Sequence, residues 1–205
     1  MSVDSLLNKL KTYQSLLFDL DNTLFSQQEF DRGAFEEIAH EFKKNGQLND
    51  RDFTHFLITE KQKRGSCYPH LFDDAIGHFG LKPRLLSQMI KIYKSHNGIY
   101  LCKDNSLQSH LKELKHSGKQ LFVVSNGYLD TQRQKLIKLG ILPLLDDYII
   151  CSGSAPQQLK PAPWAFLQLQ KKHKLIYPVM VGDNLKIDGG FAEQSHIPFI
   201  HFKYS

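Results

Sequence analysis

Short apolar runs that alternate with helical patterns constrain the fold of this chain more than any other feature. Five runs rich in Val, Ile, Leu, Phe and Tyr are each too short to be a helix, and we predict strands at residues 14–20, 120–125, 147–151, 178–182 and 197–202. Three segments between them have leucines and other apolar residues at helical spacing, near Leu111, Leu136 and Leu169. Strand alternating with helix predicts an α/β fold, in which helices cover both faces of a parallel sheet.

Residues 28–98 interrupt this alternation, because they contain helical patterns and no convincing strand. Apolar residues recur at helical spacing around Phe35, Phe53, Leu71 and Met89, which predicts four helices. We therefore expect an α/β core domain made of residues 1–27 and 99–205, and an all-helical domain, residues 28–98, inserted after the first strand. The insertion enters at the carboxyl end of that strand, so we expect it to cover this edge of the sheet like a lid.

Composition excludes several classes of protein. The 205 residues are 41% hydrophobic and 23% charged, which is ordinary for a soluble globular protein, and no segment reaches the roughly 20 apolar residues of a membrane-spanning helix. The formal charge of +5 is spread among acidic residues without a basic, aromatic-rich motif, so we expect no nucleic-acid partner. Cys67, Cys102 and Cys151 are odd in number and far apart, which favours reduced thiols and a cytoplasmic protein.

Acidic residues follow two of the predicted strands. Asp19 and Asp21 end the first strand in FDLDNT, and Asp183 ends the fourth in VGDN, with Asp188 five residues later. Taken alone, DLDNT also fits an Asx-turn or a helix N-cap. Carboxylates gathered at one sheet edge need a cation, a proton or water, however, because an isolated buried charge costs several kcal/mol. Oxygen ligands without His or Cys favour a hard metal, and Mg²⁺ is the predicted cofactor.

Two further features belong to the same edge of the predicted sheet. Ser125 and Asn126 close the second strand in a turn that Gly127 permits, which is either a simple turn or a nest for phosphate oxygens. Lys160 precedes two prolines that lead into a helix, so it lies at the loop edge near the third strand. Considered alone, such a lysine is more often a surface residue.

The four features in this order resemble the motifs of the haloacid dehalogenase superfamily of phosphohydrolases. The matching strings are DLDNT, SNG, KP and GDNLKID, and the helical insertion resembles the C1 cap of that superfamily. The resemblance implies a Rossmann-like sheet of order 5-4-1-2-3. The strings NGYLDTQRQKL, LKPAPWAF and VMVGDNLKID are most similar to the branch that contains pyrimidine 5'-nucleotidases and N-acylneuraminate-9-phosphatase.

The resemblance also implies a role for each residue. Asp19 is the expected nucleophile that forms an aspartyl-phosphate, and Asp21 the expected general acid and base. The implied Mg²⁺ ligands are Asp19, the main-chain carbonyl of Asp21 and Asp183, with Asp188 nearby or bound through water. The residues expected to bind phosphate or orient these groups are Thr23, Ser125, Asn126 and Lys160.

The sequence departs from the family pattern at two positions, and it leaves several alternative functions open. Phe191 stands where the family usually has glycine, and Asn22 replaces a frequent glycine. Asp21 argues against a dehalogenase and Thr23 against a phosphomutase, so we expect a phosphatase acting on a phosphosugar, a sugar-acid phosphate or a nucleoside monophosphate. The alternatives are a mutase, a dehalogenase and a non-catalytic phosphate-binding protein. We expect a monomer or homodimer with a small phosphorylated substrate and no membrane partner.

In the inserted segment, the basic and aromatic stretch from Lys61 to His70 allows two interpretations. It either contacts a second anionic group of the substrate or is a solvated helix end that is capped by Gly65.

Overall fold

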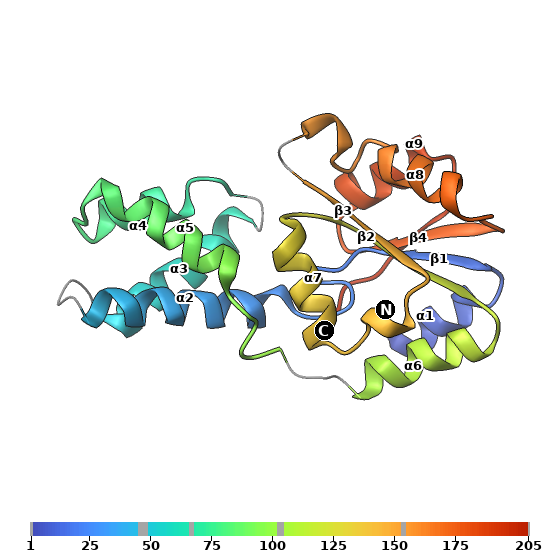
Figure 1. Ribbon diagram of the computed structural model, residues 1–205, viewed down its shortest axis with the longest axis horizontal. Coiled ribbons are helices and arrows are strands. Elements are labelled where there is room, and N and C mark those ends of the chain that lie inside the picture. Colours follow the sequence, from blue (N-terminus) through green and yellow to red (C-terminus); the bar gives the residue numbers. More distant parts are fainter. Residues whose placement is uncertain (1, 45–48, 66–67, 102–104, 153–154, 205) are drawn as a thin grey trace. The chain divides into compact units, whose positions relative to one another are not determined.

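The computed structural model describes residues 2–44, 49–65, 68–101, 105–152 and 155–204 (Figure 1). The chain divides into two compact units, which are described separately. The first, here named the core unit, consists of Met1–Ser26 and Cys102–Ser205. The second, named the helical unit, is Gln27–Leu101.

The core unit is built on a five-stranded sheet in which every pair of neighbouring strands is parallel. Its order is β3-β2-β1-β4-β5, which is the predicted order 5-4-1-2-3 read from the opposite edge, so that prediction is confirmed. In the central register, Phe18 of β1 pairs with Val123 of β2 and with Val181 of β4. The strands are β1 (Ser15–Phe18), β2 (Gln120–Asn126), β3 (Asp147–Cys151), β4 (Pro178–Gly182) and β5 (Phe199–His201).

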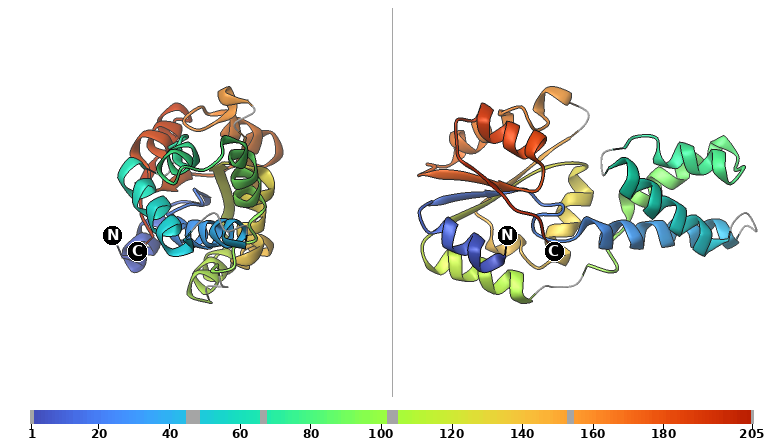
Figure 2. Two further views of the ribbon diagram at one scale, coloured as in Figure 1. Left: turned by 90° about the vertical axis from the view of Figure 1, so that its left-hand side faces the viewer. Right: turned by 180° about the vertical axis from the view of Figure 1, so that it is seen from behind.

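Helices cover both faces of this sheet. Figures 1 and 2 show α1 (Val3–Leu10), α6 (Asn105–His116) and α7 (Leu129–Lys138) on one face, and α8 (Trp164–Lys172) and α9 (Gly190–Gln194) on the other. The change of face follows from right-handed crossovers, because the chain moves outward from β1 to β3 and then returns across the sheet to β4. Short turns of helix occupy Leu142–Leu144, Pro156–Gln158 and Leu185–Gly189.

The first helix was not anticipated from the sequence. Ser2 caps α1 by accepting a hydrogen bond from the Ser5 amide, and Leu6 and Leu10 are buried on its inner side. Its eight residues present only a short apolar stripe, which is a weak sequence signal.

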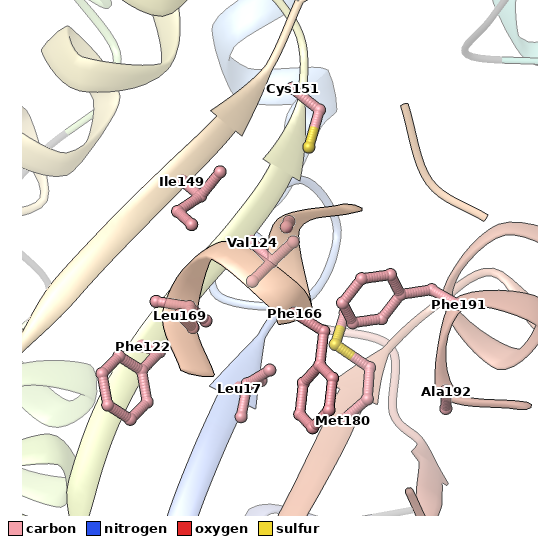
Figure 3. Close-up of a cluster of buried hydrophobic side chains, with 11 residues drawn as sticks. Leu17, Phe122, Val124, Ile149, Cys151, Phe166, Leu169, Met180, Phe191 and Ala192 are labelled. Carbon is pink, nitrogen blue, oxygen red and sulfur yellow. The ribbon is translucent and has the colours of Figure 1, made fainter. Parts of the chain in front are cut away.

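Apolar side chains from the strands and from α8 and α9 form the hydrophobic core on one face of the sheet (Figure 3). Leu17, Phe122 and Met180 come from three neighbouring strands and belong to one cluster with Phe166 of α8. Phe191 of α9 packs in the same cluster and is fully buried. Phe191 stands where the family usually has glycine, and its ring fills part of this core, which gives the departure a structural reason.

The helical unit contains the four predicted helices and, among its described residues, no strand. Apolar residues such as Phe35, Ile38, Phe53 and Met89 form its own core. The helices are α2 (Gln27–Lys44), α3 (Asp50–Arg64), α4 (Leu71–His78) and α5 (Leu86–Ser95), with a 3-10 turn at Pro83–Leu85 before α5.

Lys61 belongs to a polar network inside the helical unit, together with Asp31 and Tyr93. The Lys61 ammonium donates to Asp31 at 2.7 Å and to the Tyr93 hydroxyl at 3.2 Å, and Tyr93 donates to Asp31 at 2.7 Å. Gly65 ends α3 with φ +94° and donates its amide proton to the Lys61 carbonyl. These contacts support the interpretation of this stretch as a helix end that is capped by Gly65. Lys61 could contact a substrate only if its ion pair with Asp31 broke.

Among the described helices, none has the length and apolar character needed to cross a bilayer. Cys151 is a buried free thiol, whereas Cys67 and Cys102 lie outside the described residues. The cytoplasmic location stays a prediction.

Replacing Phe191 with alanine is expected to lower the free energy of unfolding by about 3–5 kcal/mol, because it leaves a cavity among close-packed side chains. Urea denaturation of both proteins measures the change. Leu185→Ala is the control, since Leu185 is 64% exposed and its loss should cost little. Equal stability of the two variants would contradict the packing role of Phe191.

Candidate active site

The sequence motifs meet at the carboxyl edge of the sheet. Asp19 directly follows β1, Ser125 lies at the end of β2, and Asp183 directly follows β4. Parallel pairing of β1 with both neighbours brings these strand ends together. The loop before α8 adds Lys160 to the same edge, where its ammonium contacts Asp19 and Asp188.

A tight turn after β1 directs Asp19 and Asp21 toward this edge. The Leu24 amide donates to the Leu20 carbonyl at 3.0 Å, and Asp21 and Phe25 form an isolated bridge that closes the turn. Asn22 has φ +59°, a left-handed conformation that glycine and asparagine tolerate better than other residues. This explains why Asn22 can replace the family's frequent glycine. The buried Thr23 hydroxyl donates to Asp19 at 3.5 Å, a long hydrogen bond.

Lys160 is the central cation of the site. Its ammonium donates to Asp19 Oδ1 and to Asp188 Oδ1, both at 2.6 Å. Lys160 is only 4% exposed, so its alternative interpretation as a surface residue is wrong. A buried ammonium is tolerated because two carboxylates pair with it.

Asn126 holds the backbone of Lys160 in place. Its side-chain amide donates to the Lys160 carbonyl at 3.0 Å, and its side-chain oxygen accepts from the Lys160 amide at 2.9 Å. Two hydrogen bonds in opposite directions fix both the position and the orientation of the Asn126 carboxamide. The side chain is thus engaged with the Lys160 loop, and the main-chain amide of Asn126 is the group that we assign to the predicted phosphate contact.

Asp188 is buried, and hydrogen bonds fix its carboxylate. A short π-helical turn, Leu185–Gly189, carries it back to the site, where Asp188 Oδ2 accepts from the Asn184 amide at 3.0 Å. Gly182 provides the space for this approach, because a Cβ atom at position 182 would lie 2.4 Å from Asp188 Oδ2. The glycine of VGDN is therefore required by close packing.

Three carboxylates are arranged as ligands for one cation. Asp19, Asp183 and Asp188 each offer an oxygen, and these oxygens lie within 4.8 Å of one another. Two opposite ligands of Mg²⁺ lie about 4.2 Å apart, so small side-chain adjustments would bring the oxygens onto one ion. Among the described residues, none donates a hydrogen bond to the Asp183 carboxylate. The donor set and its spacing fit Mg²⁺.

The electrostatics of the cluster also favour a cation. Burial raises the pKa of Asp19 from 3.8 to about 7 despite the attraction of Lys160, and the carboxylates of Asp188 and Asp21 contribute to the increase. Burial and Asp188 likewise raise the pKa of Asp183. Burial disfavours the Lys160 ammonium, but the pKa of Lys160 is raised because Asp19 and Asp188 flank it. Lys203 and Lys160 oppose part of the increase at Asp183. Within the described part of the chain, Lys160 is the ammonium that forms ion pairs with this cluster, so one paired lysine faces Asp19, Asp183 and Asp188.

Two residues of α7 that the sequence analysis did not predict contact Asp21. Lys135 donates to Asp21 Oδ1 at 2.7 Å, and Gln132 donates to Asp21 Oδ2 at 2.9 Å. Gln132 also donates to the Ser125 hydroxyl at 2.8 Å. The two residues are three positions apart in TQRQKL, so they lie on one face of the helix. A lysine on the helix face that packs against the sheet is the sequence signal that could have identified them.

A separate pocket of about 400 Å³ in the core unit is unsuited to phosphate. Its lining includes leucines of α1 and α6, with Phe18 and Phe202, and contains none of the site's carboxylates or lysines. The lining also includes the polar residues Thr23, Ser106, His110 and Tyr204, but among the described residues it has no lysine or arginine to neutralise a phosphate dianion, so the carboxylate cluster remains the candidate site.

Gly182→Ala is expected to weaken Mg²⁺ binding at least about tenfold, because the new methyl group displaces Asp188 and its partner Lys160. Isothermal titration with Mg²⁺ measures the affinity. Gly189→Ala is a matched control, since a Cβ atom there meets only Phe199 at an ordinary 3.5 Å. Unchanged affinity in Gly182→Ala would remove Asp188 from the metal site.

Mg²⁺ affinity is expected to fall about tenfold between pH 8 and pH 6, because a metal ligand must lose its proton and the pKa of Asp19 is raised to about 7. Titrations at both pH values test this. A pH-independent affinity would contradict the prediction.

The same raised pKa determines how stability without metal depends on pH. Asp19 stabilises the fold while it is protonated, and this contribution is lost as the pH rises through about 7. Asp19→Asn cannot ionise, so without metal it should melt higher than the unsubstituted protein at pH 8, with a smaller difference at pH 5.

Comparison with known proteins finds a matching family model and similar chains. Residues 16–202 match the family model described as haloacid dehalogenase-like hydrolase. A glyceraldehyde 3-phosphate phosphatase of Methanocaldococcus jannaschii is 30% identical over 66% of this chain, and the match spans 61% of that relative's length. The pyrophosphatase PpaX of Bacillus pumilus is 24% identical over 84% of this chain and 76% of its own.

Solved structures share the fold. The HAD hydrolase YfnB of Bacillus subtilis, crystallised with magnesium, aligns with a TM-score of 0.69 at 18% identity and covers 93% of this chain and 88% of its own. A predicted phosphoglycolate phosphatase of Haemophilus somnus aligns with a TM-score of 0.65 at 19% identity, over 96% and 88% of the two chains.

Proposed function

Because the chain belongs to the haloacid dehalogenase-like hydrolases, we propose that it is a Mg²⁺-dependent phosphatase. It hydrolyses a small phosphomonoester through an aspartyl-phosphate on Asp19. The relatives named as phosphatases support this reaction class.

One observation carries the proposal: the expected nucleophile, a carboxylate cluster that fits a metal ion and a further carboxylate meet at one sheet edge. Asp19 lies with Asp183 and Asp188 in the cluster that fits a metal ion. Asp21 is held apart from that cluster by its own donors on α7. A dehalogenase has no need of this second carboxylate, because halide leaves without a proton. A non-catalytic phosphate-binding protein would have little need of both Asp19 and Asp21.

Phosphate binding requires positive charge and donors around the transferring group. The Lys160 ammonium offers a third proton beyond its two carboxylate contacts. The Ser125 hydroxyl accepts from Gln132 and makes only a long contact of 3.4 Å to the Asn126 carbonyl, so its proton is well placed for a phosphate oxygen. We assign these two groups, with the main-chain amide of Asn126, to stabilising the charge of the transferring phosphoryl group.

The first chemical step transfers the phosphoryl group to the protein. An oxygen of Asp19 forms a bond to phosphorus while the bond from phosphorus to the substrate's ester oxygen breaks. Asp21 gives a proton to the departing alkoxide, which leaves as an alcohol. Thr23 donates to Asp19 and helps to orient the attacking carboxylate.

The assigned metal ligands are Asp19, the main-chain carbonyl of Asp21 and Asp183, with Asp188 bound directly or through water. When bound there, Mg²⁺ supplies charge that reduces repulsion between the Asp19 carboxylate and the phosphate dianion. Lys160, which pairs with Asp19 at 2.6 Å, offsets part of the same repulsion.

Substrate choice is assigned to the helical unit, Gln27–Leu101, which enters the chain directly after the turn that carries Asp21 and Thr23. The proposed substrates are phosphosugars, sugar-acid phosphates and nucleoside monophosphates. The matched relatives add triose phosphate and pyrophosphate to this range. The predicted branch of pyrimidine 5'-nucleotidases and N-acylneuraminate-9-phosphatase remains part of the proposal.

Release of inorganic phosphate from a panel of phosphate compounds tests the function. The panel contains glyceraldehyde 3-phosphate, pyrophosphate, nucleoside monophosphates, phosphorylated sugars and N-acylneuraminate 9-phosphate, each with Mg²⁺ and with a chelator. Magnesium-dependent release is expected, and the preferred compound identifies the substrate class. Asp19→Asn should lose about 10³-fold or more of the activity while staying folded, since it removes the nucleophile.

Asp130→Asn is the matched control, because Asp130 is an exposed carboxylate of α7 and should leave turnover unchanged. Activity that survives in Asp19→Asn would overturn the nucleophile assignment. No release from any compound, in a folded protein that binds Mg²⁺, would favour a mutase or a binding role.

A further inference from the structure

Helix α7 presents two buried polar side chains to the candidate site. Gln132 is 2% exposed and Lys135 is 3% exposed, on the helix face where apolar residues would be expected. Burying an ammonium costs several kcal/mol unless it is paired, and the partner that Lys135 pairs with is Asp21. The Lys135 ammonium also lies 5.4 Å from the centre of the Phe25 ring, in the turn that carries Asp21.

Gln132 connects two groups with different proposed tasks. Its amide nitrogen has two protons, and the short contacts are to Asp21 Oδ2 at 2.9 Å and to Ser125 Oγ at 2.8 Å. Gly127 gives this carboxamide its space, because a Cβ atom at position 127 would lie 3.0–3.2 Å from three atoms of Gln132. The Gln132 side chain is thereby confined between β2 and Asp21.

We propose that Lys135 and Gln132 are positioning residues that fix the Asp21 carboxylate for hydrolysis of the phosphorylated protein. The inference rests on the proposed function, since it needs the aspartyl-phosphate on Asp19. Each donor occupies a different oxygen of Asp21, so rotation of the carboxylate breaks both hydrogen bonds. A lone pair remains on each oxygen to accept a proton from water.

The step that these residues support is attack by water on phosphorus. The water oxygen forms a bond to phosphorus, and the bond between phosphorus and the Asp19 oxygen breaks. One proton of the water passes to Asp21, and Asp19 leaves as a free carboxylate. A carboxylate that turns away from the water loses this proton transfer, whereas phosphoryl transfer from a substrate with a good leaving group needs no proton from Asp21.

This difference makes the role measurable with p-nitrophenyl phosphate, whose leaving group departs without protonation. In Lys135→Met, kcat and KM are both expected to fall about tenfold or more, while kcat/KM changes less than about threefold. Rapid-mixing experiments should then show a burst of nitrophenolate that approaches one equivalent per protein, because the aspartyl-phosphate accumulates. Lys135→Arg, which keeps the charge and the donors, should recover part of kcat.

Gln132→Met keeps every charge of the site and should show the same burst, with a lower kcat/KM because Ser125 also loses its donor. This variant decides the question if Lys135→Met does not fold. Lys138→Met and Gln134→Met are matched controls on the same helix. Both should retain the kinetics of the unsubstituted protein, because Gln134 is exposed, Lys138 is half-buried, and neither is the donor of the hydrogen bonds to Asp21.

The outcomes separate this inference from the function on which it rests. If the unsubstituted protein is active and the variants lose kcat/KM without any burst, or lose nothing, the positioning role is wrong and the phosphatase stands. If the unsubstituted protein releases phosphate from no compound in the panel, the proposed function fails, and the inference fails with it.

Discussion

The ion pairs between Lys160 and two carboxylates are the interaction on which the rest of the site depends. The Lys160 ammonium lies 2.6 Å from both Asp19 and Asp188, and all three residues are buried. Among the described residues, four carboxylates in this region face two ammonium groups that form ion pairs with them, Lys160 and Lys135, so two more negative than positive charges belong to this set when all are ionised. Lys203 offsets part of this excess at Asp183 without forming an ion pair there. A divalent cation would compensate that excess. Burial is the main cause of the raised pKa values of Asp19 and Asp183, and the neighbouring carboxylates add to it.

The backbone around these charges is fixed by polar side chains and glycines more than by apolar packing. Asn126 holds the Lys160 backbone through two hydrogen bonds, and Gly182 leaves the only space in which the Asp188 carboxylate fits as placed. The apolar core lies below, where Phe191 and Phe166 pack against the sheet. The core supports the strand ends, while hydrogen bonds set the positions of the charged atoms that catalysis requires.

The two acidic groups of DLDNT have separate surroundings, which is what different chemical tasks require. Asp19 belongs to the metal-ligand cluster and to Lys160, whereas Asp21 is bound by Lys135 and Gln132 of α7. This separation fits the proposal that Asp19 attacks phosphorus while Asp21 gives and accepts protons. The helix after β2 therefore contributes to the proposed chemistry as well as to the cover of the sheet.

The sequence by itself determined the α/β class, the five strands and the helical insertion, because periodicity and strand length are local properties of the chain. The strand order came from family resemblance, and the structure confirms it. The motifs also identified the acidic residues and Lys160, since polar residues after buried strands stand out against apolar runs. Only the tertiary structure decided that Lys160 is buried between Asp19 and Asp188, and that Lys135 and Gln132 reach Asp21. These contacts join residues more than 100 positions apart, except for Lys160 with Asp188, and no local pattern specifies which distant charge a buried side chain will meet.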